Sequence, residues 1–155
     1  MKDWGQALKD SMVTGAAAAF ASSAAVAWRG RQDSGSPLAP INATSHVFWG
    51  DEAGEVEQAT WRHTLPGLLI NAGAGVWWAL VLQKLYGDQI DKHGLPAAVL
   101  GATATAALAY AVDYHFLPKR LTPGWELRIT RRSLFLGLGA MAVGLAAGAL
   151  LSRGR

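Results

Sequence analysis

Four apolar segments separated by polar ones organise this chain. Residues 12–28, 64–83, 94–112 and 133–151 contain no Lys, Arg, Asp or Glu. A helix rises about 1.5 Å per residue and needs about 17 or more apolar residues to cross a bilayer core. The pattern therefore predicts an all-α fold, an integral membrane four-helix bundle in which residues 1–155 form a single membrane domain.

Connectivity assigns the polar segments to two membrane faces. Residues 29–63 and 113–132 share one face, and the other receives the N-terminus, the link 84–93 and residues 152–155. Lys and Arg near span ends favour the cytoplasmic side. They are slightly more numerous on the first face (Arg29, Arg31, Arg62, Lys119, Arg120, Arg128, Arg131, Arg132) than on the second (Lys2, Lys9, Lys84, Lys92, Arg153, Arg155). This count favours a cytoplasmic first face, whereas cytoplasmic termini would place that face outside, so orientation stays open.

Composition agrees with a membrane protein. Hydrophobic residues make up 51% of the chain and charged residues 16%, against roughly 25% charged in soluble globular domains. The formal net charge is +3. Cysteine is absent, which excludes disulfides, thiolate metal sites and cysteine nucleophiles. The basic residues flank the spans instead of forming a stripe on a soluble domain, so nothing supports nucleic-acid binding.

Small residues at four-residue spacing mark helix faces that can pack closely in lipid. The stripes are Gly67-Asn71-Gly75 in the second span, Gly101-Thr105-Ala109 in the third, and Gly144-Gly148 in the fourth. They are expected to build the bundle, with the alternative that the fourth stripe forms a contact between copies. The Asn71 amide is costly in an apolar span without a partner, so we expect it to face Thr103 or Thr105. Tryptophans near helix ends are expected to anchor in the headgroup region (Trp4, Trp28, Trp61 and Trp125).

A polar cap is predicted from residues 29–63 and 113–132. The loop between the first two spans is expected to be partly helical, with Asp51 capping a segment that continues through Glu55 toward His63. An ionisable group at membrane depth is costly, so Asp113 is a functional-site hypothesis. This face collects three of the four histidines and seven of the eleven acids (Asp33, Asp51, Glu52, Glu55, Glu57, Asp113, Glu126).

The residues of this cap are compatible with three interpretations. In the favoured one it is structural: Asp113 pairs with Arg62 or Arg120, His63 and His115 bond neighbouring carbonyls or carboxylates, and the network closes one end of the bundle. In the second, Asp113, His115 and His63 perform acid–base or proton-relay chemistry. In the third, the cap binds zinc, manganese or iron, although neither a His-Glu-x-x-His nor a Glu-x-x-His spacing occurs. The metal candidates are His46, Glu52, His63, Asp113 and His115.

Several of these segments resemble small bacterial four-span inner-membrane proteins of no assigned activity. The similar motifs are SHVFWGDEA at 45–53, His63-Thr64, Asp113-Tyr114-His115 and RLTPG at 120–124, within a stretch from about residue 42 to 132. The resemblance implies a multi-pass protein of the bacterial inner membrane. It assigns no role to any residue.

The favoured function is an interaction, assembly or structural role of a small polytopic membrane protein. Its expected partners are the lipid bilayer and either a second copy or another membrane protein. If the first face is cytoplasmic, the basic cluster before the fourth span could also contact anionic lipid headgroups (Lys119, Arg120, Arg128, Arg131 and Arg132). Two alternatives are a membrane-embedded metal-binding or acid–base enzyme, and an oligomeric small-solute transporter or channel whose path Asn71 and Asp113 would line. Apart from such a metal ion, no cofactor is expected.

Overall fold

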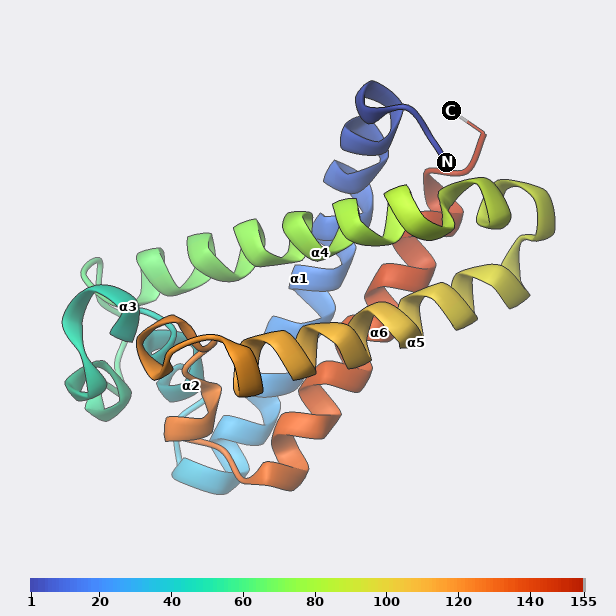
Figure 1. The fold of residues 1–155 in the computed structure, drawn as a ribbon. Helices are drawn as coiled ribbons and strands as arrows, with labels where there is room; N and C mark the ends of the chain where they lie inside the picture. Colours follow the sequence, from blue (N-terminus) through green and yellow to red (C-terminus); the bar gives the residue numbers. More distant parts are fainter. Residues whose placement is uncertain (155) are drawn as a thin grey trace. The chain divides into compact units, whose positions relative to one another are not determined.

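The computed structural model describes residues 1–154, and every regular element in that range is helical. The four longest helices are α1 (Trp4–Ser34), α4 (Thr64–His93), α5 (Leu95–Ala111) and α6 (Arg131–Leu151), as Figure 1 shows. Each is long and apolar enough to cross a membrane, α5 together with the turn that carries it to Phe116. The prediction of an all-helical chain with four such helices is confirmed.

Two helices extend well beyond their apolar segments. α1 begins at Trp4 and ends at Ser34, and α4 continues to His93, so the predicted link at 84–93 is wrong because those residues are helical. α4 ends where Gly94 adopts a φ of +66° and its N–H bonds the Ile90 carbonyl at 2.8 Å. Hydropathy marks the part of a helix that suits lipid, whereas the helix itself ends where the backbone turns.

The segment between α1 and α4 is partly helical, as predicted, but its helices differ from the expected one. It contains α2 (Ala39–Ala43), α3 (His46–Trp49) and the 3₁₀ helix η1 (Asp51–Glu55). Gly50, at φ +79°, separates α3 from η1, and Val56 is extended. The expectation that Asp51 caps a helix running toward His63 is therefore wrong, because the chain leaves helical geometry on both sides of η1.

The residues group into two compact units, and each long helix contributes to both. Unit 1 contains Met1–Ser22, Ala72–Ala109 and Gly139–Arg155, and unit 2 contains Ser23–Asn71 and Tyr110–Leu138. Both segments of the cap, 29–63 and 113–132, belong to unit 2.

Glycines let the helices of unit 1 approach closely. A Cβ atom on Gly75 would lie 2.7 Å from the Gly15 carbonyl oxygen, so α4 packs directly on the α1 backbone. A Cβ on Gly144 would lie 2.7 Å from Ala18 Cα, and one on Gly148 would lie 2.6 Å from a backbone atom of the same helix, α1. The predicted close-packing role of these stripes is confirmed. The alternative use of the fourth stripe between copies is wrong, because α1 already covers it.

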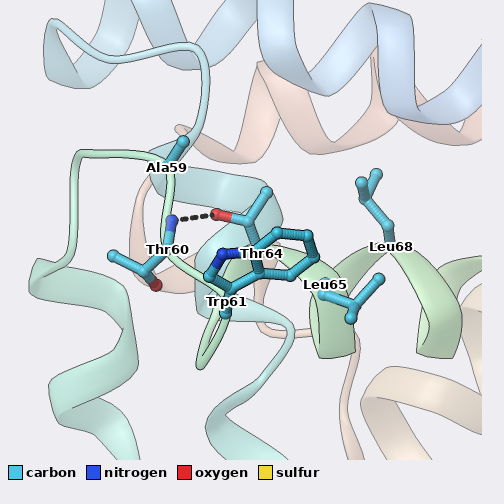
Figure 2. Close-up of a pocket in the computed structure, with 6 residues that line it drawn as sticks. All are labelled: Ala59, Thr60, Trp61, Thr64, Leu65 and Leu68. Carbon is cyan, nitrogen blue, oxygen red and sulfur yellow. Dashed lines mark hydrogen bonds between the residues drawn. The ribbon is translucent and has the colours of Figure 1, made fainter.

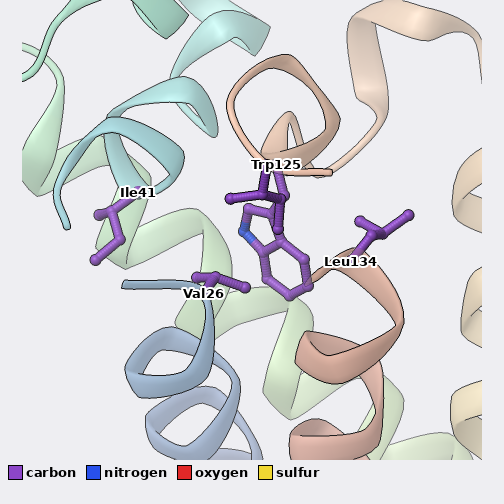
Figure 3. Close-up of a cluster of buried hydrophobic side chains, with 5 residues drawn as sticks. Val26, Ile41, Trp125 and Leu134 are labelled. Atoms are coloured by element: carbon purple, nitrogen blue, oxygen red, sulfur yellow. The ribbon is translucent and has the colours of Figure 1, made fainter. Parts of the chain in front are cut away.

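A small hydrophobic core holds unit 2 together. Its buried members are Val26, Ile41, Trp125, Ile129 and Leu134, four of which are labelled in Figure 3. Trp125 is 4% exposed, so its predicted role as a headgroup anchor is wrong. The preceding glycine, at φ +82° after a proline, has the geometry of a type II turn, and this turn directs the indole into the core. The other three predicted anchors, Trp4, Trp28 and Trp61, are exposed.

Candidate functional site

The interior of the cap is organised around a single amide. Asn42 is fully buried, and its Nδ2 donates to the carbonyls of Val56 at 2.8 Å and Gln58 at 2.9 Å. Its Oδ1 accepts a 2.6 Å hydrogen bond from Thr64 Oγ1, at the first residue of α4. One side chain therefore joins α2, the extended segment after η1 and the start of α4.

His46 is a buried structural residue of the same cap. Its Nε2 lies 2.7 Å from the Thr122 carbonyl oxygen, an arrangement in which Nε2 carries the proton and donates it. Its Nδ1 lies 3.8 Å from Asp51 Oδ1, beyond hydrogen-bond distance. By sequence His46 is only a metal-ligand candidate, whereas in the structure its ring bonds a main-chain carbonyl.

The two cap arginines have partners other than those expected. The Arg62 guanidinium lies 4.3 Å from the ring centroid of Trp49, whose Nε1 donates to the Arg62 carbonyl at 2.8 Å. Arg120 donates to the carbonyls of Val47 at 2.9 Å and Phe48 at 3.2 Å. The expected ion pair of Asp113 with Arg62 or Arg120 is therefore wrong. Arg62 instead stacks on a ring and Arg120 bonds carbonyls, and these contacts hold α3 (His46–Trp49).

The three acid–base candidates do not share one element: two lie on one turn and the third lies elsewhere in the cap. Asp113 and His115 belong to η2 (Val112–Phe116), a π-helical turn that ends the third long helix, where the exposed His115 ring lies 5.1 Å from the Tyr110 ring. His63 lies just before α4, with its Nδ1 3.1 Å from Thr60 Oγ1.

The metal candidates are likewise not brought together. Within residues 1–154 there is no group of three or more His, Asp or Glu side chains that could hold a metal ion. Glu52 is exposed on η1, and each of the three histidines has a different partner.

Asn71 has a different partner from the one predicted. Its Nδ2 donates to Ser23 Oγ on α1 at 2.5 Å. The expected pairing with Thr103 or Thr105 is wrong, because the small residues of α4 at this level face α1.

A groove of about 390 Å³ opens beside the start of α4 (Figure 2). The backbone N–H of Thr60 donates to Thr64 Oγ1 at 3.0 Å across its polar end, and the rest of the lining is mainly apolar. The lining residues are Ala59, Thr60, Trp61, Thr64, Leu65 and Leu68.

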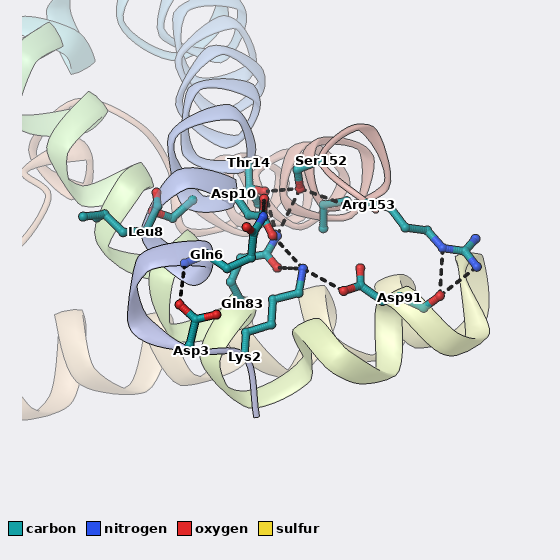
Figure 4. A network of polar contacts seen from close by, with 12 residues as sticks. Lys2, Asp3, Gln6, Leu8, Asp10, Thr14, Gln83, Asp91, Ser152 and Arg153 are labelled. Carbon is teal, nitrogen blue, oxygen red and sulfur yellow. Dashed lines mark hydrogen bonds and ion pairs between the residues drawn. The ribbon is translucent and has the colours of Figure 1, made fainter. Parts of the chain in front are cut away.

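A buried polar cluster in unit 1 was not anticipated from the sequence (Figure 4). Lys2 Nζ contacts Asp10 Oδ2 at 2.6 Å, Asp91 Oδ2 at 3.1 Å and Gln83 Oε1 at 3.2 Å. Gln83 Nε2 in turn donates to Thr14 Oγ1 at 3.0 Å. The cluster joins the chain before α1 to α1 and α4, and the only sequence signal for it was a glutamine at the end of an apolar segment.

Removing the central amide of the cap is expected to loosen it. Asn42→Ala leaves the carbonyls of Val56 and Gln58 and the Thr64 hydroxyl without their partner, so the free energy of unfolding should fall by about 2 kcal/mol. Thermal unfolding in detergent measures the change, with the exposed Gln58→Ala as control. Equal stability of the two variants would contradict the assigned role of Asn42.

The Lys2 cluster predicts a loss of stability at alkaline pH. Burial lowers the pKa of the Lys2 ammonium, but its hydrogen bonds to Asp10 and Asp91 and their charges outweigh burial and hold the pKa above 10.5. A raised folded-state pKa contributes stability that is complete below the unfolded-state pKa and is lost as pH rises through the folded-state value. Between about pH 9 and 12, the unfolding temperature of the parent should therefore fall more steeply than that of Lys2→Met. Parallel profiles would contradict this.

Comparison with known protein families, curated proteins and solved structures found no match.

Proposed function

We propose that this chain is a small multi-pass protein of the bacterial inner membrane with an interaction or assembly role. Large apolar side chains on the outer surfaces of the long helices are the observation that carries the membrane assignment. In water each would be unfavourable by about 25 cal/mol per Å² of apolar surface, whereas lipid solvates them. Those more than half exposed include Phe20, Leu69, Trp77, Leu100 and Val143.

The construction of the cap supports binding as its role. Asn42, His46 and Arg120 all bond main-chain carbonyls, which fixes the path of the loop between α1 and α4. A loop held in this way can present the same outer surface to every partner, since little conformational entropy is lost on binding. Around it, Phe48 and Trp61 remain exposed.

Membrane fractionation combined with cysteine labelling tests the membrane assignment. The chain has no native cysteine, so a single Gln58→Cys or Lys92→Cys reports one site in an otherwise intact protein. The protein should stay in the membrane pellet after alkaline carbonate extraction, and the two cysteines should differ in reactivity toward an impermeant reagent. A soluble protein labelled equally at both sites would overturn the proposal.

The interaction role is tested separately from the membrane assignment. A partner or second copy should be recovered by crosslinking in intact membranes, and an inserted protein that crosslinks to neither would contradict the interaction role. Stoichiometric metal in protein purified without chelators, together with a metal-dependent reaction abolished by Asp113→Asn or His63→Ala, would replace this role with the enzyme alternative.

A further inference from the structure

A compact group of aromatic and guanidinium side chains lies on the outer surface of the cap. It consists of Phe48 and Trp49 on α3 with Arg62 and Arg120 beside them, and we call it the aromatic–arginine shelf. The rings of Phe48 and Trp49 are 6.2 Å apart, and Arg62 stacks on Trp49 at 4.3 Å. Phe48 is 58% exposed, and both arginines are exposed. Among residues 1–154, no carboxylate lies within ion-pair distance of either guanidinium.

The shelf is continuous in sequence with the groove beside α4. Trp61 lines the groove and the next residue, Arg62, belongs to the shelf. The groove then follows the first turns of α4 along Leu65 and Leu68 (Figure 2). The start of this apolar helix is therefore flanked by two cationic groups, by exposed indoles and by an apolar groove.

We propose that the shelf and groove together bind an anionic phospholipid. The phosphate group contacts Arg62 and Arg120, while the upper part of an acyl chain lies against Leu65 and Leu68. This inference rests on the proposed membrane location, because it requires α4 to enter the bilayer near Thr64.

The chemistry of the surface favours a lipid over a protein partner. If α4 enters the bilayer at Thr64, Arg62 is two residues outside it, at the depth of the phosphate groups. Indole rings favour the same depth, and guanidinium groups bind phosphate oxygens in a bidentate manner. An acyl chain is also the apolar group available beside a membrane-spanning helix. Zwitterionic lipid carries no net negative charge to balance the two arginines. Preferential binding of an anionic headgroup is therefore the property expected of this site.

Native mass spectrometry of the detergent-purified protein tests the proposal. Phosphatidylglycerol and phosphatidylcholine with identical acyl chains are the probes, and the parent protein should retain one phosphatidylglycerol in preference. Arg62→Gln or Arg120→Gln should each weaken its retention roughly fivefold, and the double variant roughly 25-fold if the two contacts are independent. Filling the groove with Ala59→Phe should weaken retention of both lipids.

The matched control removes two other exposed arginines of unit 2. Arg131→Gln with Arg132→Gln makes the same change in net charge at the start of α6. Equal loss of phosphatidylglycerol in the control, or no preference in the parent, would overturn the proposal. If Arg120→Gln disturbs α3, Arg62→Gln alone still decides the question, because it removes the stacking contact on Trp49 but keeps the Arg62 carbonyl that accepts from Trp49 Nε1.

Photocrosslinking in intact membranes identifies the class of occupant. A benzophenone side chain in place of Phe48 should form lipid adducts, and predominant adducts to another protein would overturn the proposal. Different results refute the membrane location and the lipid site. A protein that carbonate removes from membranes refutes both proposals. A membrane-embedded protein without selectivity for anionic lipid refutes the lipid site alone.

Discussion

Asp10→Ala is expected to lower the free energy of unfolding by about 3–5 kcal/mol, the largest effect of any single substitution proposed for this protein. The Lys2 and Asp10 side chains are 6% and 3% exposed and lie 2.6 Å apart. Removing the carboxylate leaves a buried ammonium group with Gln83 and the partly exposed Asp91 as partners. The remaining contacts do not replace a fully desolvated opposite charge.

Thermal and denaturant unfolding in detergent measure this effect. The double variant Lys2→Met, Asp10→Leu should recover most of the lost stability, because a buried ion pair can often be replaced by apolar side chains of similar volume without loss. Lys9→Met is the control, since Lys9 is exposed and adjacent to Asp10 in sequence. An Asp10→Ala protein as stable as the control would mean that the buried cluster does not hold unit 1 together.

Gly144→Leu should lower the free energy of unfolding by about 3 kcal/mol, the upper end of the usual cost of overpacking. A Cβ at this position would lie 2.6 Å from the Ala17 carbonyl oxygen and 2.7 Å from Ala18 Cα. These are main-chain atoms of α1, so they cannot be relieved by a side-chain rotation. The two helices must separate or the new side chain must be strained.

The same helix provides a matched control in Gly139→Leu. Within residues 1–154, no atom outside the local backbone of α6 lies within 4 Å of a Cβ built at Gly139. Replacing a helical glycine by leucine should raise helix stability by a few tenths of a kcal/mol or more. Opposite signs for the two variants are expected in thermal unfolding. If Gly144→Leu instead changed only the oligomeric state, the stripe would have to face a second copy and not α1.

Hydropathy predicted the four long helices because their central residues carry the signal themselves. Neither the start of α1 at Trp4 nor the continuation of α4 to His93 could be found that way, since Lys2, Asp10 and Asp91 break the apolar pattern. Those charges are tolerated in and beside a helix because they contact one another. Such contacts join residues far apart in sequence, so a hydropathy pattern over neighbouring residues does not show them.

The candidate chemistry of the cap was predicted only as residue types. A histidine such as His46 suits a metal site or a structural hydrogen bond equally well until its neighbours are known. Its Nε2 partner is a carbonyl 76 residues away. The buried amide of Asn42 has no sequence signal of its own, because asparagine is common in polar loops.

By itself, the sequence determined the class of this protein: four apolar helices, with charge confined to their ends and to the polar segments between them. These properties are local, because an apolar run long enough to span lipid is visible residue by residue. Only the tertiary structure decided which polar groups meet, as in the contact of Lys2 with Gln83, 81 residues apart. It also decided that Trp125 is core and that α1 covers Gly144, because such pairings depend on which helix faces approach each other.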